Sequence, residues 1–461
     1  MKLWRRRRGK AAADDRGLLM LGVSALVGGA LSGVVVAIFR LALQRADLWR
    51  TALIAKAHGL PVVGFAVIVL GAAAAFALAA WLVRRFEPYA SGSGIPQIEA
   101  TLHGDLPPET PFLLPVKFGG GLLAIGVGGA LGREGPSVQM GAVVVRLVGL
   151  LFRRTWPDMQ RLIAAGAGAG LAVTFNAPLA GAVFVLEELF QRFEARMAMA
   201  ALAASGAAIL VSRLFLGNAP DFQVAISAHA AAATGPLPYA AAATLPLYLL
   251  LGVAAGIAAA LYNRALMGMI LLTDRIDRIR FLRFPVEVQA AAIGAGIGIV
   301  GWFLPALVGG GDDITQRLLA GGAVIGLIPL AFAIRFGLGA VSYAARAPGG
   351  LFAPLLVLGT QIGLLCGTLL QPVFPALGIQ PNAFAVVGMA AFFTGVVQAP
   401  VTGIVLVTEM TAAFTTLLPM IAACFVAMLT AHLLRAPPIY DWLRERLVRH
   451  ARLPAQERQD R

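Results

Sequence analysis

The strongest constraint on the fold is a series of long apolar stretches, such as residues 62–83 and 243–261. A helix needs about 20 apolar residues to cross the hydrocarbon core of a bilayer, which is about 30 Å thick. Several stretches of the chain reach that length. The sequence therefore predicts an all-α membrane protein that crosses a lipid bilayer several times.

The composition agrees with this prediction. Of the 461 residues, 59% are hydrophobic and 13% are charged, whereas soluble proteins have roughly a quarter of their residues charged. The 53 glycines fit close packing between membrane-spanning helices. Cys366 and Cys424 lie in apolar segments and give neither a disulfide framework nor a metal-binding spacing, so no metal site is expected.

The net charge of +14 is explained by where the basic residues lie. They gather before the first apolar stretch, after the second, in a mid-chain loop and in the tail. They are Arg5 to Arg8, Lys10, Arg84, Arg85, Arg275, Arg278, Arg280, Arg283, Arg435, Arg444, Arg446, Arg449 and Arg452. This pattern is typical of cytoplasmic segments, so we expect both termini in the cytoplasm and no nucleic-acid partner. The first apolar stretch (18–39) is too long for a cleavable signal peptide.

Two kinds of apolar segment occur along the chain. Long segments are residues 18–45, 62–83, 198–216, 241–272 and 287–308. Shorter segments, many of them interrupted by glycine or proline, are residues 118–131, 137–152, 162–175, 178–190, 321–339, 351–371, 383–397, 400–414 and 417–434. Most of the shorter ones cannot cross a bilayer upright.

These segments predict five parts of the chain. They are a basic cytoplasmic arm (1–16), a first transmembrane repeat (17–216), an external linker (217–240), a second transmembrane repeat (241–434) and a basic cytoplasmic C-terminal segment (435–461). The tail is too short and too polar to form a second soluble domain.

An internal repeat supports the division into two halves. Residues 177–187 (APLAGAVFVLE) align with residues 399–409 (APVTGIVLVTE), 222 positions later. Matching broken segments in two halves are typical of secondary transporters, which hold their substrate near the bilayer midplane. If the halves are inverted and both termini are cytoplasmic, each half crosses the membrane an odd number of times.

Three glycine-rich stretches are candidate helix starts: residues 92–96 (GSGIP), 132–136 (GREGP) and 349–354 (GGLFAP). Helix N-termini carry partial positive charge and free N–H groups, so they favour anions. Backbone amides together with a hydroxyl such as that of Ser93 suit a halide, because they replace its hydration without a full charge that would hold it too tightly.

Glu134 lies in the second of these stretches, between two apolar segments. An ionisable group at bilayer depth is costly and is by default a candidate functional residue. Pro136 fits the first turn of a helix, so the sequence predicts a helix N-terminus directed into the protein with Glu134 at its mouth. Desolvation should raise the pKa of this carboxyl, and a nearby bound anion should raise it further. Proton binding and anion binding would then be linked.

The three stretches resemble the signature motifs of the CLC chloride channels and chloride/proton antiporters. The motif residues are Gly92, Ser93, Gly94, Ile95 and Pro96; Gly132, Arg133, Glu134, Gly135 and Pro136; and Gly350, Leu351, Phe352, Ala353 and Pro354. Their order and spacing match, and the resemblance covers roughly residues 18–447. It is to bacterial-type members without paired nucleotide-binding (CBS) domains, so no control by ATP is expected.

The resemblance implies a fold, an activity and an assembly. The expected fold is the CLC type, with two inverted-topology repeats of broken, tilted helices. The expected activity is electrogenic exchange of chloride for protons in a bacterial inner membrane. The expected assembly is a homodimer in which each subunit has its own anion pathway, and no cofactor is expected. Gln97 departs from the motif, where many members have glutamate.

The resemblance also implies residue roles. Ser93 Oγ, the Tyr440 hydroxyl and the backbone N–H groups of Leu351 and Phe352 would bind chloride. Glu134 would be the gating glutamate, whose carboxylate occupies an anion position and leaves it on protonation. Glu188 would be the internal proton-transfer glutamate, a residue found in antiporters and typically replaced in channels.

Other functions stay open at this point. A passive chloride channel of the same family is the main alternative, because motifs only suggest coupling. An intramembrane enzyme is more remote: the five histidines are scattered, and Asp312 and Asp313 lie in a stretch expected to be a glycine-rich loop. Residues 296–301 fit G-x-G-x-x-G but lie within an apolar span, which favours helix packing over dinucleotide binding.

Structural roles are also possible for the glutamates. Glu134 could pair with Arg133 or Lys117, and Glu188 could be a satisfied charge at a helix end. We expect structural roles for Glu187, Glu99 and Glu409, paired with Lys117 or with basic loop residues.

Overall fold

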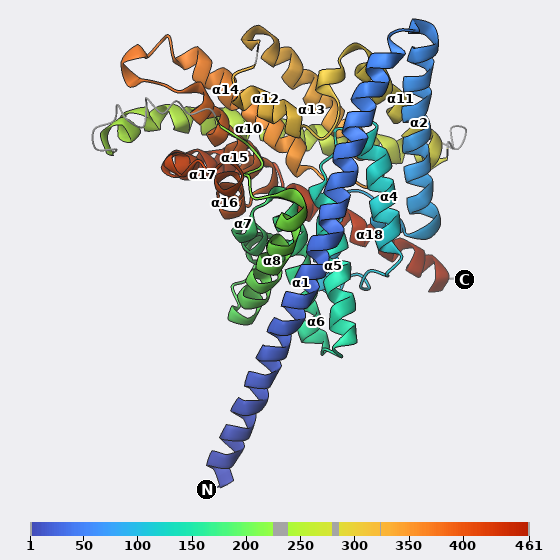
Figure 1. The fold of residues 1–461 in the computed structure, drawn as a ribbon, viewed down its shortest axis with the longest axis vertical. Coiled ribbons are helices and arrows are strands. Elements are labelled where there is room, and N and C mark those ends of the chain that lie inside the picture. Colours follow the sequence, from blue (N-terminus) through green and yellow to red (C-terminus); the bar gives the residue numbers. More distant parts are fainter. Residues whose placement is uncertain (1, 225–237, 279–284, 323, 460–461) are drawn as a thin grey trace.

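The computed structural model describes residues 2–224, 238–278, 285–322 and 324–459, with side chains described for 17–224, 243–276, 285–322 and 324–451 (Figure 1). This part of the chain consists of helices and their connections, and its β-structure is limited to two isolated bridges. Eight of the helices are long and apolar enough to span a membrane. The prediction of an all-α, multi-pass membrane protein is confirmed.

The helices follow one another in this order. In the first half they are α1 (Lys2–Ala57), α2 (Pro61–Phe86), α3 (Ile95–Leu102), α4 (Leu113–Gly126), α5 (Glu134–Leu151), α6 (Trp156–Phe175), α7 (Pro178–Phe184), the π-helical turn η2 (Val185–Leu189) and α8 (Ala195–Leu216). In the second half they are α10 (Pro238–Arg278), α11 (Val286–Phe303), α12 (Asp312–Leu319), α13 (Ile328–Ala344), α14 (Phe352–Leu370), α15 (Pro381–Val397), α16 (Pro400–Thr411), α17 (Leu417–Leu433) and α18 (Ile439–Gln459).

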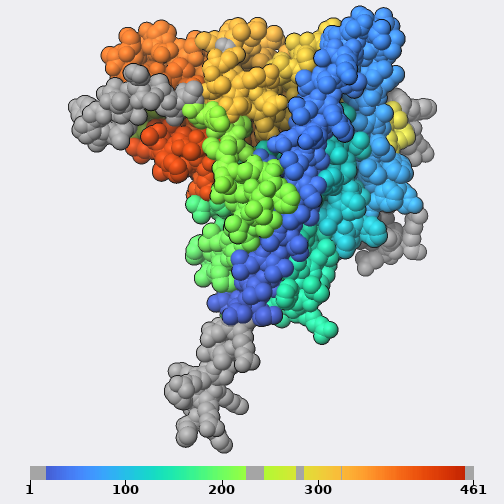
Figure 2. Space-filling model, viewed as in Figure 1, coloured from blue at the N-terminus to red at the C-terminus, as the bar shows by residue number. Residues whose placement is uncertain are grey.

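Small residues let the helices approach closely. Figure 2 shows α1 and α8 side by side on one face of the molecule. A Cβ added to Gly29 or Gly33 of α1 would lie 2.2 Å or 2.5 Å from the carbonyl oxygen of Ala204 or Ala208 of α8. This small-xxx-small pattern on both partners is typical of helix pairs in membranes.

The repeat offset of 222 residues reappears in the backbone. α6 and α15 end at Asn176 and Gln398, and both residues have left-handed backbone angles (φ 49° and 66°). α7 and α16 then begin at Pro178 and Pro400, where a missing N–H costs nothing. The two broken helix pairs therefore have the same local construction.

Glu187 and Glu409, which also differ by 222 positions, join the two halves. The Glu187 carboxylate accepts hydrogen bonds from the N–H groups of Val401 (3.0 Å) and Thr402 (2.6 Å) at the start of α16. The Glu409 carboxylate accepts from those of Leu179 (3.2 Å) and Ala180 (2.8 Å) at the start of α7. Each half thus satisfies free helix-end amides of the other, where negative charge is also favoured.

Two expectations for charged side chains are corrected. Glu187 and Glu409 bind helix ends rather than Lys117 or basic loop residues. The fully buried Lys117 donates instead to the carbonyl oxygens of Ala90 (3.0 Å) and Gly92 (2.8 Å). Glu99 does pair with a basic residue, Arg444, at 2.9 Å.

Several element boundaries also differ from the prediction. Asp312 and Asp313 form the first turn of helix α12 rather than a loop, and α13 begins at Ile328 instead of residue 321. The segment predicted as 178–190 changes at Val185 from an α-helix to a π-helical turn. The basic tail is mostly the helix α18. Of the predicted linker 217–240, residues 225–237 lie outside the described part.

Candidate functional site

The three glycine-rich turns meet in space, although more than 200 residues separate the third from the other two. Gly132 N donates to Gly350 O (2.8 Å) and Gly350 N donates to Gly132 O (2.7 Å). Gly349 N donates to Gly92 O (3.0 Å), and Gly92 N donates to Ala347 O (3.2 Å). Backbone pairing between the turns brings the starts of α3, α5 and α14 together.

This convergence requires glycine at the points of contact. A Cβ on Gly135 would lie 2.5 Å from Ser93 O and 3.0 Å from the Cα of Gly350, so one position touches both other turns. A Cβ on Gly350 would lie 2.0 Å from Glu134 Oε1. Side chains at these positions would force the turns apart or displace the carboxylate.

Glu134 is the first residue of α5 and is completely buried. Its Oε1 accepts a 2.6 Å hydrogen bond from the N–H group of Phe352, the first residue of α14. Its Oε2 has no hydrogen-bond partner among the described residues. The carboxylate thus occupies an amide site at a helix N-terminus, which is where an anion would bind.

The alternative in which Glu134 is held by a structural ion pair is not observed. Within the described side chains, Arg133 pairs with Asp221 (3.1 Å) and Asp312 (3.3 Å), and Lys117 binds carbonyl oxygens. Glu134 is therefore held by helix-end amides rather than by a cation.

Ser93 and Tyr440 come to the same place from opposite ends of the chain. Ser93 is buried, and its Oγ accepts a hydrogen bond from Ile95 N (3.2 Å) at the start of α3. α18 carries the buried Tyr440 next to Phe352, with ring centroids 6.0 Å apart. The Tyr440 hydroxyl faces Ser93 but has no hydrogen-bond partner of good geometry in the described part of the chain. An unpaired buried hydroxyl is costly unless a ligand satisfies it.

Aromatic rings form the apolar wall of this site. The ring of Phe352 packs against those of Phe175, Phe184 and Phe393, with centroid separations of 6.3, 6.0 and 4.6 Å. Leu351, which precedes it, is also completely buried. The pocket is therefore apolar except for backbone amides, two hydroxyls and one carboxylate.

Glu188 lies in the π-helical turn η2, where Phe190 N donates to Val185 O (2.9 Å). Single π-helical turns are frequent at functional sites. The side chain is partly buried, and its charged neighbours are Glu99, Asp441, Glu187 and Arg444. Tyr440 is within electrostatic range of both Glu134 and Glu188. The tyrosine thus connects the two glutamates that the sequence singled out.

A charged cavity of about 700 Å³ leads to the start of α14. We call it the vestibule. Its lining includes Arg40, Asp47, Arg50, Arg133, Asp221 and Asp312, and it reaches Leu131 and Ala353, the residue after Phe352. The vestibule gives hydrated ions an approach to the buried carboxylate.

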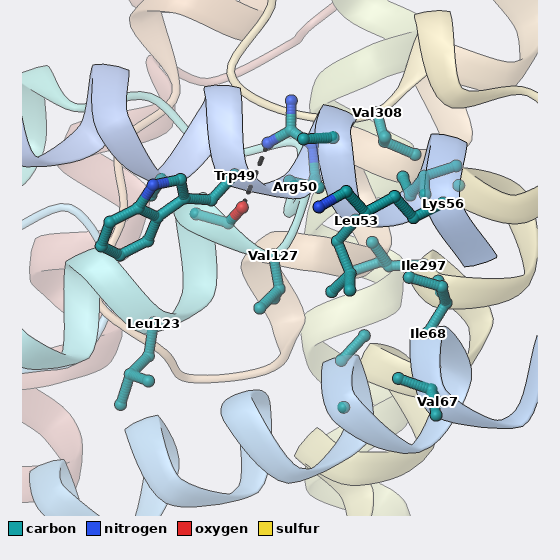
Figure 3. A pocket seen from close by; sticks show the side chains of 18 of the residues that line it. Trp49, Arg50, Leu53, Lys56, Val67, Ile68, Leu123, Val127, Ile297 and Val308 are labelled. Atoms are coloured by element: carbon teal, nitrogen blue, oxygen red, sulfur yellow. Dashed lines mark hydrogen bonds between the residues drawn. The ribbon is translucent and has the colours of Figure 1, made fainter. Parts of the chain in front are cut away.

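A second cavity of about 560 Å³ lies on the other side of Arg50 (Figure 3). Its wall is mostly apolar, with Trp49, Leu53, Val67 and Ile68 among its lining side chains. Arg50 lines both cavities, pairs with Asp47 and donates to Gly126 O (3.2 Å). No carboxylate or nucleophile lines this second cavity, so it is not the candidate anion site.

Some functional neighbours were not found from the sequence. Asp221 and Arg40 are distant from the motifs along the chain, and only the fold brings them to Arg133. Tyr343, whose hydroxyl accepts a hydrogen bond from Ser93 N (3.4 Å), carries no motif. Lys117 did carry a signal, since a cation in an apolar segment is unusual, but its carbonyl partners could not be inferred.

Comparison with known proteins gives one consistent result. The family described as "Voltage gated chloride channel" matches residues 74–432. An H(+)/Cl(-) exchange transporter ClcA from Vibrio cholerae is 37% identical over 452 residues, covering 96% of this chain and 93% of the relative. A protein of the same name from Cronobacter sakazakii is 37% identical over 425 residues, covering 90% and 88%.

Solved structures agree with the sequence relatives. A slow cyanobacterial Cl⁻/H⁺ antiporter is 32% identical, with a TM-score of 0.86 over 93% of this chain and 98% of that one. A CLC-type fluoride/proton antiporter shares the fold at 22% identity, with a TM-score of 0.71 over 89% and 95%. The predicted fold class is confirmed.

Proposed function

Because the chain belongs to the CLC family of voltage-gated chloride channels and their relatives, we propose that it exchanges chloride for protons across a bacterial inner membrane. It is a membrane transporter rather than an enzyme. The observation that carries the proposal is the buried Glu134 carboxylate, which accepts the N–H hydrogen bond of Phe352 where three glycine-rich turns meet.

The coupling follows from competition for one site. Ionised Glu134 fills the helix-end position and excludes chloride. Protonation removes the charge that the amides attract, so the side chain leaves and chloride enters from the vestibule. Ser93, Tyr440 and the amides of Leu351 and Phe352 then bind the anion. Since each ligand favours the other, proton and chloride movements become linked.

Glu188 supplies protons from the cytoplasmic side in this scheme. The cluster of Glu99, Asp441 and Glu187 around it makes a local site of negative charge that attracts protons. The route between Glu188 and Glu134 differs from the chloride path and passes Tyr440. The presence of Glu188, together with relatives named as exchange transporters, supports exchange over a passive channel.

The organisation of the chain is part of the proposal. Residues 17–216 and 241–434 would be the two inverted repeats, with residues 217–240 as an external linker. Residues 1–16 and 435–461 would be cytoplasmic, an orientation supported by the arginines of α18. The functional assembly would be a homodimer in which each subunit transports independently.

Coupled flux in liposomes tests this proposal. Purified protein is reconstituted into vesicles with an outward chloride gradient and equal pH on both sides. We expect chloride efflux to drive proton uptake against the resulting pH difference, measured together with a chloride electrode and a pH electrode. Chloride efflux without proton movement would show a passive channel and overturn the exchange proposal.

A further inference from the structure

Four side chains of alternating charge form a connected group in the wall of the vestibule. Arg40 of α1 donates to Asp221 at 2.8 Å, Asp221 pairs with Arg133 at 3.1 Å, and Arg133 pairs with Asp312 of α12 at 3.3 Å. The first three side chains are at most 11% exposed, whereas Asp312 is 34% exposed. Arg40 also donates to Val173 O (2.6 Å).

The position of Arg133 within this group is unexpected. Arg133 directly precedes Glu134 in the chain, and a free guanidinium so close to a buried carboxylate would be attracted to it. Instead it is turned toward Asp221 and Asp312, while Glu134 bonds the Phe352 amide. The two aspartates therefore compete with Glu134 for the guanidinium.

We propose that Asp221 and Asp312 are positioning residues that hold the Arg133 guanidinium in the vestibule wall, away from Glu134. In that position Arg133 attracts chloride to the mouth of the pathway but leaves the gate free to accept a proton. An Arg133–Glu134 pair would stabilise the ionised carboxylate and keep the gate closed until a lower pH. The inference rests on the proposed function, because it takes Glu134 as the gate.

Every charged group that faces Arg133 fits this role. Arg40 and Asp47 face it from α1, Asp221 from the segment after α8, Asp312 from α12 and Glu134 from α5. Asp221 lies between two arginines, so Arg40 fixes the aspartate that in turn fixes Arg133. The connected group has equal numbers of arginines and aspartates, and removing one aspartate leaves a positive charge beside the gate.

The segment that carries Asp221 is itself anchored to both halves of the protein. Ala219 O accepts a hydrogen bond from Asn176 Nδ2 (2.8 Å), the residue that ends α6. Phe222 N donates to Met410 O (3.0 Å) in α16. The connection between the repeats therefore places a carboxylate on the neighbour of the gate.

Adjacent aspartates in α12 provide a matched test. Asp312 and Asp313 both lie in the first turn of α12 and both line the vestibule, but only Asp312 contacts Arg133. We expect Asp312→Asn to shift the pH of half-maximal coupled exchange downward by about one unit, since more acid is needed to protonate a carboxylate near a freed cation. Asp313→Asn removes the same charge and should leave the profile unchanged.

A double variant separates positioning from direct repulsion between Asp312 and Glu134. If Asp312 acts through Arg133, the shift caused by Asp312→Asn should vanish in an Arg133→Gln background. Asp221→Asn is a second variant and should shift the profile in the same direction. Gel filtration and melting temperature establish that each variant is folded.

The outcomes distinguish this inference from the proposed function. Equal shifts in Asp312→Asn and Asp313→Asn, or a shift that persists with Arg133→Gln, would overturn the positioning role while exchange itself stands. Wild-type protein that moves chloride without protons would overturn the exchange proposal and this inference with it.

Discussion

Glu134→Gln is expected to abolish proton transport while chloride transport continues. Glutamine keeps the shape of the side chain but cannot carry the negative charge that the Phe352 amide and the α14 N-terminus attract. It also cannot take up and release a proton at the gate. In liposomes, chloride efflux should persist at every pH, and chloride-driven proton uptake should fall by about 100-fold or more, to the leak level.

A surface carboxylate provides the control for this experiment. Glu445 is 59% exposed and pairs only weakly with Arg449 across one helical turn. Glu445→Gln should leave both fluxes unchanged. A Glu134→Gln protein that still pumps protons would remove Glu134 from the mechanism and return it to a structural role.

Glu188→Gln is expected to retain chloride transport and lose proton transport by a similar factor, about 100-fold. The chloride site needs Ser93, Tyr440 and the amides of α14, and Glu188 contributes none of these groups. Its expected task is to pass protons from the cytoplasm toward Glu134. The measurement is again paired chloride and proton flux, with the stoichiometry taken from their ratio.

The matched control for Glu188 is Glu194→Gln. Glu194 follows closely in the chain and binds Arg161 (2.7 Å), and its side chain is 35% exposed. Such a partly exposed pair contributes little, so exchange should continue normally. Unchanged coupling in Glu188→Gln would favour the alternative of a satisfied charge at a helix end.

Local patterns in the sequence predicted most of the helices. Apolar runs predicted spans such as α2 and α17, and proline marked the starts of α7 and α16. The repeat offset correctly paired Glu187 with Glu409. It could not predict that each carboxylate caps the helix of the other half, because this exchange depends on how the two halves face each other.

The elements that were missed have physical reasons. α12 is only eight residues long and begins with two aspartates, so it carries no apolar signal, although acidic residues at a helix start are favourable. α18 is polar and basic, yet its first turn delivers the buried Tyr440. The change to a π-helical turn at Val185 has no marker in composition.

The candidate site divides in the same way. Motif spacing predicted the three helix starts, and the fold brings their backbones into direct contact at Gly132, Gly350 and Gly92. The roles of Ser93, Glu134 and Glu188 remain predictions from family resemblance. The partners of Arg133 could not be predicted, because Asp221 and Asp312 lie 88 and 179 positions further along the chain.

The central claim is that chloride and the ionised Glu134 carboxylate alternate at one amide site. Chloride binding measured by isothermal titration calorimetry at several pH values tests it directly, in wild-type protein and in Glu134→Gln. The account predicts that wild-type affinity for chloride rises as pH falls, with protons taken up on binding, whereas Glu134→Gln binds tightly at every pH without proton uptake. Equal affinity and equal pH dependence in the two proteins would contradict it.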